Sequence, residues 1–342
     1  MRCMKKLTYK FSNSSTDYYL AYGISHLKEF VDLHNAVIIT DENVFSNHRK
    51  RFKNWRVIVL QPGEEQKTQA TVDSIIAQLI MMEADRKTTL IGVGGGVITD
   101  ITGYAASIYM RGIKFGFIPT TLLSMVDASI GGKNGVDVGI YKNLVGIIRQ
   151  PSFILHDLVF LNSLPRSEWI NGFAEIIKHA CIKDAAMFNE LESNTLKKYQ
   201  GRKTLVCELI QRNAILKTKV VQLDEFEKGD RKLLNFGHTL GHALENQYDL
   251  SHGQAISVGM AYACNISKQI TGFKETERAV GVLEKYGLPT YAKFDKQKVF
   301  NALKMDKKRE RKEISYVLLE KIGRGVVKTI SLDQLEKIIQ QL

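Results

Sequence analysis

Hydrophobic residues in the first part of the chain follow two periodicities in alternation. Short runs rich in β-branched residues occur at 36–40, 56–60, 88–93 and 115–119. Such runs are typical of buried strands. Between the second and third run, residues 68–83 carry apolar side chains at helical spacing. Strands that alternate with helices form βαβ units, so we predict an α/β domain with a parallel sheet in residues 1–160.

The pattern changes after about residue 160. Long amphipathic segments follow at 168–182, 204–221 and 254–270. Their length and periodicity predict helices, and strand signals return only at 314–327. We therefore predict a mostly helical domain in residues 161–342. Since no proline- or glycine-rich linker separates the halves, we expect them to pack tightly and to leave a cleft between them.

Composition narrows the class of protein. The 342 residues are enough for two domains. The chain shows neither a signal-peptide pattern nor an apolar segment of the roughly 18 residues that a membrane helix needs, so we expect a cytoplasmic protein without a membrane partner. Its four cysteines, Cys3, Cys181, Cys207 and Cys264, are far apart. They indicate neither a disulfide framework nor a thiolate zinc site.

The net charge of +12 fits nucleic-acid binding, attraction of an anionic substrate, or solubility alone. The densest basic run, at 307–313, is interrupted by acidic residues and has no aromatic side chains interleaved with it for base stacking. We therefore expect no nucleic-acid partner.

Three glycines, Gly94, Gly95 and Gly96, end an apolar strand and open the helical pattern of 98–110. Backbone N–H groups at such a helix start bind phosphate readily. The run is not the dinucleotide fingerprint G-x-G-x-x-G, because Val97 or Thr99 occupies its last position. A tight structural turn would explain the glycines as well. The segments 40–44 and 62–68 also follow predicted strands, where α/β proteins carry ligand-binding loops.

The segment 111–146 sets polar side chains among glycines and small residues. Two lysines and an arginine near one site would suit a phosphate or a carboxylate. Taken singly, each would be a surface charge. The polar residues of this segment are Arg111, Asp127, Lys133, Lys142 and Asn143.

Histidines cluster in the second half, where five of the chain's eight fall within 156–252. His238 and His242 share a helix face at a spacing of four, Glu175 and His179 do the same, and His252 follows in a short loop. Three or four nitrogen and oxygen ligands with one open position describe a catalytic zinc site. A single helical histidine is more often structural, and spacing alone leaves the ligand set open.

These residues stand in motifs that resemble the 3-dehydroquinate synthase family over nearly the whole chain. The matching motifs are PGEEQKT, GGGVITDITGYAA, YMRGIKFGFIPTTLLSMVDASIGGKNGV, YKNLVG, GFAEIIKHA, RKLLNFGHTLGHALE, SHGQAISVGM and DKK. The resemblance implies a Rossmann-like, NAD-binding α/β domain in 1–160 and a helical metal- and substrate-binding domain in 161–342. It also implies a homodimer and a catalytic zinc in the cleft, with cobalt as a possible substitute.

The resemblance assigns roles residue by residue. The implied metal ligands are Glu175, His238 and His252. The implied cofactor contacts are Asp41, Asn43, Glu64, Lys67, Gly95, Gly96, Asp100, Thr120, Thr121, Asp127, Lys133, Lys142 and Phe160. The implied substrate contacts are Arg111, Asp127, Lys133, Lys142, Asn143, Lys178, Lys217, Arg231, Asn235, His242 and Lys307. Lys133, Lys178, Asn235 and His242 are the candidates for catalysis, Arg111 is expected to reach across the dimer interface, and Lys308 is an alternative to Lys307.

The implied activity is a phosphate-eliminating cyclisation of 3-deoxy-D-arabino-heptulosonate 7-phosphate, in which NAD oxidises the substrate transiently. Three other functions are alternatives to this one. A sister cyclase would act on glucose 6-phosphate, on sedoheptulose 7-phosphate or on an amino analogue of the same substrate. The two sugar phosphates lack the carboxylate that Arg231 and Lys217 suit. A metal-dependent alcohol or glycerol dehydrogenase would release NADH. A non-catalytic binding protein is disfavoured because the ligand set is complete.

Overall fold

A computed structural model describes residues 4–139, 141–304, 309–310 and 313–341 of the chain. The chain divides into two compact units: Met1–Glu168 with Lys203–Glu225, and Trp169–Arg202 with Phe226–Leu342. This division is less simple than a single boundary near residue 160. The segment Lys203–Glu225, which patterning assigns to the helical half, returns to the first unit because its helix packs there.

The first unit is built on a seven-stranded sheet in the order β1-β2-β9-β6-β5-β3-β4. Only the β1–β2 pair is antiparallel. The strands are β1 (Lys5–Lys10), β2 (Ser15–Leu20), β3 (Ala36–Asp41), β4 (Arg56–Leu60), β5 (Thr89–Gly94), β6 (Lys114–Pro119) and β9 (Phe153–His156). The expected parallel α/β sheet is thus confirmed, and each of the four strands read from the sequence is present.

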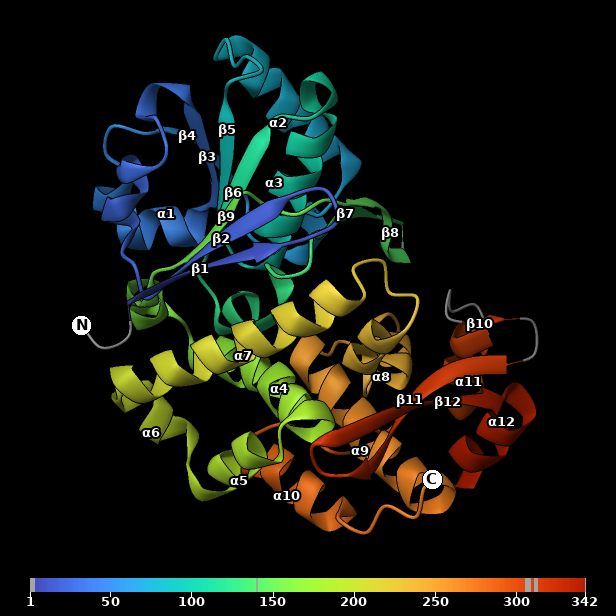
Figure 1. Cartoon of the computed structure of the whole chain (residues 1–342). Coiled ribbons are helices and arrows are strands. Elements are labelled where there is room, and N and C mark those ends of the chain that lie inside the picture. The colour runs from blue at the N-terminus through green and yellow to red at the C-terminus, as the bar shows by residue number, and fades with distance from the viewer. Residues whose placement is uncertain (1–3, 140, 305–308, 311–312, 342) are drawn as a thin grey trace. The chain divides into compact units, whose positions relative to one another are not determined.

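Helices cover both faces of this sheet (Figure 1). Successive strand residues point to opposite faces, so Val37 and Ile39 of β3 join one apolar cluster while Ile38 joins the other. The first cluster packs under two long helices and the second under the shorter ones. The helices are α1 (Glu42–His48), α2 (Gln69–Met81) and α3 (Gly96–Ile108), with the single turns η1 (Ile24–Glu29), η2 (Leu33–Asn35), η3 (Arg49–Phe52), η4 (Glu64–Gln66), η5 (Tyr109–Arg111), η6 (Ser124–Ala128) and η7 (Leu158–Ser163).

A separate hairpin, β7 (Lys133–Val138) and β8 (Tyr141–Ile148), packs beside α3. Its approach to the helix is close: a Cβ on Gly103 of α3 would lie 1.9 Å from the Asn134 side chain. The β8 strand exposes several large apolar side chains, and the polar segment identified in the sequence therefore contains a two-stranded sheet with exposed apolar residues.

Helix α7 (Lys203–Leu223) belongs to the first unit. Ala214 enters the apolar cluster of the sheet, and the Thr218 hydroxyl donates to the Tyr18 hydroxyl at 3.0 Å in a buried position. These contacts are made by residues about 200 positions apart in sequence, which explains why patterning alone did not place this helix.

The second unit is mostly helical, as expected (Figure 1). Its interior is rich in aromatic rings: Phe173 stacks on Tyr286 at 4.5 Å between ring centroids, and Tyr199 packs beside both. Among the described residues, no helix is long and apolar enough to cross a bilayer. The elements are α4 (Arg166–Lys183), α5 (Ala185–Ser193), α6 (Leu196–Gly201), η8 (Asp230–Asn235), α8 (His238–Glu245), α9 (His252–Ile270), α10 (Thr276–Lys285), α11 (Lys296–Lys304), β10 (Arg309–Glu310), β11 (Glu313–Lys321), β12 (Arg324–Ser331) and α12 (Leu332–Gln341).

Candidate active site

Helices α4, α8 and α9 of the second unit carry the predicted metal ligands. His238 and His252 are each the first residue of their helix. Gly237, which precedes His238, lies where α8 and α9 pack closely. It has φ +78°, and a Cβ at this position would lie 2.8 Å from the Ile256 carbonyl oxygen. Only glycine fits this approach. The start of α8 is thereby fixed against α9.

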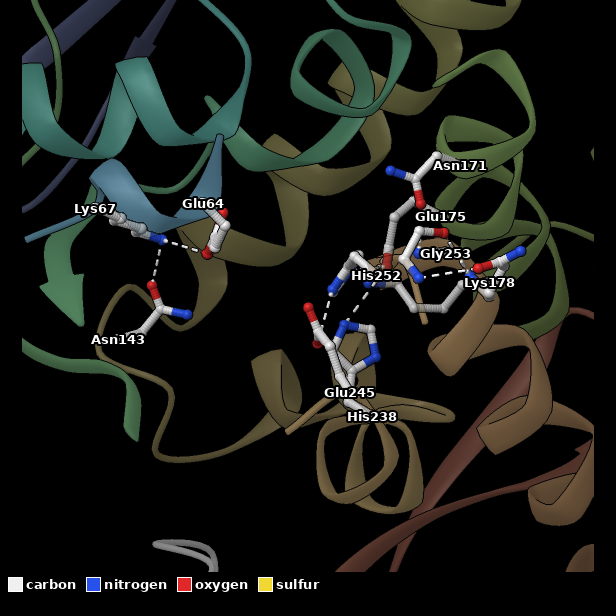
Figure 2. A network of polar contacts seen from close by, with 12 residues as sticks. Glu64, Lys67, Asn143, Asn171, Glu175, Lys178, His238, Glu245, His252 and Gly253 are labelled. Atoms are coloured by element: carbon white, nitrogen blue, oxygen red, sulfur yellow. Dashed lines mark hydrogen bonds and ion pairs between the residues drawn. The ribbon is translucent and has the colours of Figure 1, made fainter. Parts of the chain in front are cut away.

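The three predicted ligands converge on one point (Figure 2). Glu175 Oε1 lies 3.5 Å from His238 Nε2 and 3.3 Å from His252 Nε2. One ligand atom from each residue lies within 4.8 Å of the others. Glu175 is fully buried, whereas the His252 ring keeps 28% of its surface exposed, which leaves one side of the cluster open.

The remaining polar atoms of these side chains face protein groups. His238 Nδ1 lies 3.1 Å from the Phe236 carbonyl oxygen, which can only accept, so Nδ1 carries a proton while Nε2 faces Glu175. Lys178 forms an ion pair with Glu175 Oε2. His252 Nδ1 lies 3.3 Å from Glu245 Oε2. Hydrogen bonds and ion pairs from protein groups to the side chains that bind a metal orient those side chains.

One carboxylate and two imidazoles with an open side fit a zinc ion and its close substitutes. The electrostatics agree with this fit. Burial lowers the pKa of His252, but hydrogen bonds to Glu175 and Glu245 outweigh it and raise the pKa to about 10. The cluster therefore favours a cation, which is a proton on the imidazole when no metal ion takes its position.

The second unit also carries predicted substrate-binding residues. The His242 ring is 5.0 Å from that of His238 and 6.3 Å from that of His252, between centroids. Asn235 Nδ2 donates to Glu227 Oε1 at 2.6 Å. Arg231 is buried in η8. Lys307 and its alternative Lys308 lie outside the described residues.

In the first unit, strand order reverses between β3 and β5, since the chain runs from β3 out to β4 and then continues on the other side. Ligands of open α/β sheets bind at the carboxyl ends of the strands beside such a reversal. The predicted cofactor residues gather at this edge. Asp41 ends β3, Asn43 lies in α1, Glu64 and Lys67 follow β4, Gly95 and Gly96 follow β5, Asp100 lies in α3, and Thr120 and Thr121 follow β6.

The glycine run forms a narrow turn into α3. A Cβ on Gly94 would lie 2.5 Å from the Ile98 side chain, and Cβ atoms on Gly95 and Gly96 would press on Thr121 and Ala128 at 3.2 and 3.3 Å. Gly95 is the N-cap of α3 and has no side chain to cover the first N–H groups of the helix. A phosphate can therefore reach the backbone there, and these residues fit a dinucleotide.

Lys67 is the centre of a polar network beside this turn (Figure 2). Its Nζ lies 2.6 Å from Asp100 Oδ2 and 3.9 Å from Glu64 Oε1, and it donates to Asn143 Oδ1 at 2.6 Å. Burial lowers the pKa of Lys67, but the carboxylates outweigh it and hold the pKa above its usual value. Lys67 is thus a permanent cation that joins the predicted cofactor residues to the β7–β8 hairpin.

The structure places the other predicted residues of this unit at separate points. Lys217 of α7 ion-pairs with Asp127 at 2.8 Å and donates to its backbone oxygen at 2.7 Å. Lys133 is exposed at the start of β7, and Lys142 lies half-buried in β8. The Phe160 ring is buried and packs edge-on against His48 at 4.7 Å between centroids, so the ring serves the apolar core.

Two residues beside the metal cluster were missed by sequence reasoning. Glu245 contacts His252, and Asn171 accepts a hydrogen bond from the backbone N–H of Gly253 at 2.5 Å. Glu245 follows His238 by seven residues, two helical turns along the same face, so its spacing could have drawn attention to it. Asn171 precedes Glu175 by one turn, but no sequence signal connects it with residue 253.

Family models cover most of the chain. The model described as "3-dehydroquinate synthase N-terminal" matches residues 57–171, and the one described as "3-dehydroquinate synthase C-terminal" matches residues 172–309. The 3-dehydroquinate synthase of Methylacidiphilum infernorum is 43% identical over 295 residues, which cover 84% of this chain and 80% of that protein. The 3-dehydroquinate synthase of Thermoanaerobacter pseudethanolicus is 35% identical, with 98% of this chain and all of that protein covered.

Solved structures with this fold include two sugar-phosphate cyclases. A 2-deoxy-scyllo-inosose synthase in complex with carbaglucose-6-phosphate, NAD⁺ and Co²⁺ aligns with a TM-score of 0.85 and 25% identity over 98% of this chain and 100% of its own. The 2-epi-5-epi-valiolone synthase of Streptomyces hygroscopicus, with NAD⁺ and Zn²⁺ bound, aligns at 0.88 and 25% over 97% and 98%. An iron-containing alcohol dehydrogenase of Thermotoga maritima, at 0.68 and 14% over 97% and 99%, shares the fold alone.

Proposed function

Because the chain belongs to the 3-dehydroquinate synthase family, we propose that it converts 3-deoxy-D-arabino-heptulosonate 7-phosphate into 3-dehydroquinate and phosphate. The enzyme would be a carbon–oxygen lyase of the shikimate pathway, which leads to chorismate and the aromatic amino acids. The proposed sequence of events is transient oxidation, phosphate elimination, reduction, ring opening and intramolecular aldol closure. The convergence of Glu175, His238 and His252 is the observation that carries the proposal.

These three residues would hold the metal ion, zinc or cobalt. When bound, the ion supplies Lewis acidity to the oxygen at the carbon that is oxidised. The protein's own contribution is orientation: Lys178 fixes the outer carboxylate oxygen of Glu175, and the Phe236 carbonyl fixes the His238 tautomer. His242, next to the cluster, is the proposed proton-transfer residue on this unit, together with the Lys133 amine from the first unit.

NAD⁺ would bind at the carboxyl edge of the parallel sheet, where it supplies a hydride acceptor and donor, so that the conversion has no net redox change. The turn at Gly95 and Gly96 offers backbone N–H groups to its pyrophosphate. Asp41 is the last residue of β3, on the other side of the strand-order reversal, where α/β proteins contact a ribose. The buried Lys67–Asp100 pair would keep this edge in one conformation.

Cationic residues support an anionic substrate. Lys178 and Arg231 are almost fully buried in the second unit, and lysine and arginine side chains are common ligands of phosphate and carboxylate groups. A substrate with both a phosphate and a carboxylate would suit such side chains. Asn235 and the exposed Lys133 would add neutral and cationic donors. The net charge of +12 attracts the same class of ligand.

We also propose a homodimer that forms through the β7–β8 hairpin. On one face of β8, Leu144 is 58% exposed and Ile148 is 36% exposed, and contiguous exposed apolar residues on an edge strand mark an interaction surface. Arg111 is exposed, and a Cβ on the next residue, Gly112, would lie 3.5 Å from the side chain of Arg149, which follows β8. An exposed Arg111 at the rim suits the expected reach into a partner subunit.

The described cysteines, Cys181, Cys207 and Cys264, are buried thiols that take part in no disulfide. Free thiols suit a reducing compartment, and we propose a cytoplasmic enzyme on this ground.

The sister cyclases are the second candidate, since two of them share the fold with NAD⁺ and a metal ion bound. The relatives named 3-dehydroquinate synthase are more similar in sequence, at 35–43% identity against 25%. Arg231 suits the same choice, because its planar guanidinium can bind a carboxylate in bidentate fashion, and glucose 6-phosphate and sedoheptulose 7-phosphate have no carboxylate.

The test is turnover by the purified protein. With the heptulosonate phosphate, NAD⁺ and Zn²⁺ we expect phosphate release without accumulation of NADH, and a chelator should stop it reversibly. Stoichiometric NADH would identify a dehydrogenase instead. Turnover of glucose 6-phosphate or sedoheptulose 7-phosphate, with none of the heptulosonate phosphate, would identify a sister cyclase.

The ligand assignment has its own control. His252→Ala should lose both zinc and turnover, whereas His34→Ala, which removes an exposed imidazole from η2, should keep both. Zinc retained in the His252 variant would contradict the assignment.

A further inference from the structure

The His252 imidazole lies between two carboxylates (Figure 2). Its Nε2 is 3.3 Å from Glu175 Oε1, and its Nδ1 is 3.3 Å from Glu245 Oε2. Glu245 keeps only 8% of its side chain exposed, so its contact with His252 is largely screened from solvent. The two carboxylates come from different helices, α4 and α8, and meet the ring on its two nitrogen atoms.

The backbone of His252 is held independently of this ring contact. Ser251 is the N-cap of α9, and it forms a capping box with Gln254. Asn171 accepts the N–H of Gly253 at 2.5 Å, and a Cβ on Gly253 would lie 2.5 Å from the same oxygen. With the helix start fixed in this way, the remaining freedom of His252 is the rotation of its side chain.

The Glu245 carboxylate lies where it can restrict the rotation of the His252 side chain. It lies seven residues after His238 on α8, two turns further along the same helix face. One helix therefore supplies both a metal ligand and the carboxylate that meets the neighbouring ligand. The arrangement parallels that of His238, whose Nδ1 meets the Phe236 carbonyl oxygen.

We propose that Glu245 is the positioning residue of the metal ligand His252: it accepts the Nδ1–H hydrogen bond, sets the tautomer and directs Nε2 to the ion. The proposal rests on the metal site of the proposed function. A carboxylate behind a ligating imidazole also makes the imidazole a stronger ligand, and removal of such a partner weakens metal binding by about 10- to 100-fold.

A competing arrangement uses the same residues differently. His242, Glu245 and His252 also bring ligand atoms within 4.8 Å of one another. In that arrangement Glu245 would bind the ion directly and His252 would coordinate through Nδ1. The two arrangements differ in which nitrogen of His252 carries the proton when the metal is bound.

The first experiment compares zinc affinity of Glu245→Gln with that of the unmodified protein by competition with a chromophoric chelator. We expect a dissociation constant about 10- to 100-fold higher, and a visible spectrum of the cobalt-loaded variant that shifts but keeps the same coordination number. The matched control is Glu320→Gln, which removes a carboxylate from an exposed ion pair with Arg324 in the same unit. It should leave affinity and spectrum unchanged.

The outcomes separate the two proposals. If Glu245→Gln binds zinc as tightly as the unmodified protein and gives the same cobalt spectrum, the positioning role is wrong while the metal site stands. If the variant loses a ligand, as a change in coordination number would show, Glu245 binds the ion directly and the positioning role is again wrong. If the unmodified protein binds neither metal, the proposed function fails first.

A second measurement needs no variant and so decides the question even if Glu245→Gln does not fold. Nitrogen-15 NMR of the histidine rings in the zinc-loaded protein reports which ring atoms are protonated. The proposal requires His252 to bind zinc through Nε2 and to keep its proton on Nδ1. Binding through Nδ1 would overturn it.

Discussion

Lys67 donates a hydrogen bond of 2.6 Å to the side-chain oxygen of Asn143, across 76 residues of sequence. Asn143 stands at φ +53° in β8, a backbone conformation that needs support from its neighbours. The same ammonium holds Asp100 at 2.6 Å. The predicted nucleotide edge and the substrate-side hairpin are therefore joined through one cation.

Lys67→Met should impair both functions of this cation. We expect the KM for NAD⁺ and the KM for the substrate each to rise roughly 10- to 100-fold, since a hydrogen bond to a charged group contributes about 1.5–3 kcal/mol. Steady-state kinetics measure both constants. In a cycle with Asn143→Ala the effects on substrate KM should be less than additive. Full additivity would show that the two residues act separately.

Gly253→Ala tests the tight contact between α4 and α9. The added Cβ would lie 2.5–2.8 Å from atoms of Asn171, and overpacking of this kind costs about 1–3 kcal/mol. We expect lower unfolding free energy and weaker zinc binding, measured by denaturant titration and chelator competition.

Gly281→Ala is the matched control for that variant. Gly281 lies in α10 of the same unit, with nothing within 4 Å of its Cβ position. Its substitution should stabilise the protein by up to about 1 kcal/mol, because alanine favours helix over glycine. Equal effects of the two substitutions would contradict the packing argument.

Leu144→Lys tests the proposed dimer. A charge on the exposed apolar face of β8 would have to be buried in the interface, so we expect dissociation into monomers in sedimentation experiments. Met81→Lys is the control, because Met81 is 83% exposed at the end of α2, outside the hairpin. An unmodified protein that sediments as a monomer would refute the proposal directly.

His156 makes stability depend on pH. Its Nε2 donates to the Met125 carbonyl oxygen, its Nδ1 has no hydrogen-bond partner among the described residues, and burial lowers its pKa to about 4. The unfolded chain binds a proton near the ordinary pKa of about 6.5. Between these values the unfolded state holds more protons, so this contribution to stability is complete above pH 6.5 and falls as the pH drops towards 4.

His156→Gln should remove this dependence. From about pH 7.5 to about pH 5 we expect the unmodified protein to lose about 2 kcal/mol more unfolding free energy than the variant, because each pKa unit corresponds to about 1.4 kcal/mol. Urea titrations at both pH values measure the difference. Parallel losses in the two proteins would show that His156 is protonated in the folded state.

Patterning predicted local structure well where periodicity was strong. The strand read at 115–119 is β6 (Lys114–Pro119), and the helix read at 254–270 is α9 (His252–Ile270). It missed β1, β2 and the β7–β8 hairpin, whose alternation is broken by polar residues and glycines, and it also missed β9, which has only four residues. The position of α7 could not be read either, because its amphipathic face does not tell which unit it covers.

The candidate site, too, could be predicted only in part from the sequence. Spacing found the histidines but could not choose among them, because helix periodicity relates residues only within one helix. His252 and Glu175 are 77 residues apart and meet only in three dimensions. The resemblance to a family named the same three ligands, and the geometry of their nitrogen and oxygen atoms is consistent with that choice.

The return of α7 to the first unit affects how the protein is made. All seven strands of the sheet have been synthesised once the ribosome has passed residue 156. Ala214 and Thr218, which complete the packing around Tyr18, are synthesised only after α4, α5 and α6. The packing of the first unit is therefore completed only after part of the second unit has been translated. A protein truncated after residue 171 would lack α7 and would expose the apolar surface that α7 covers.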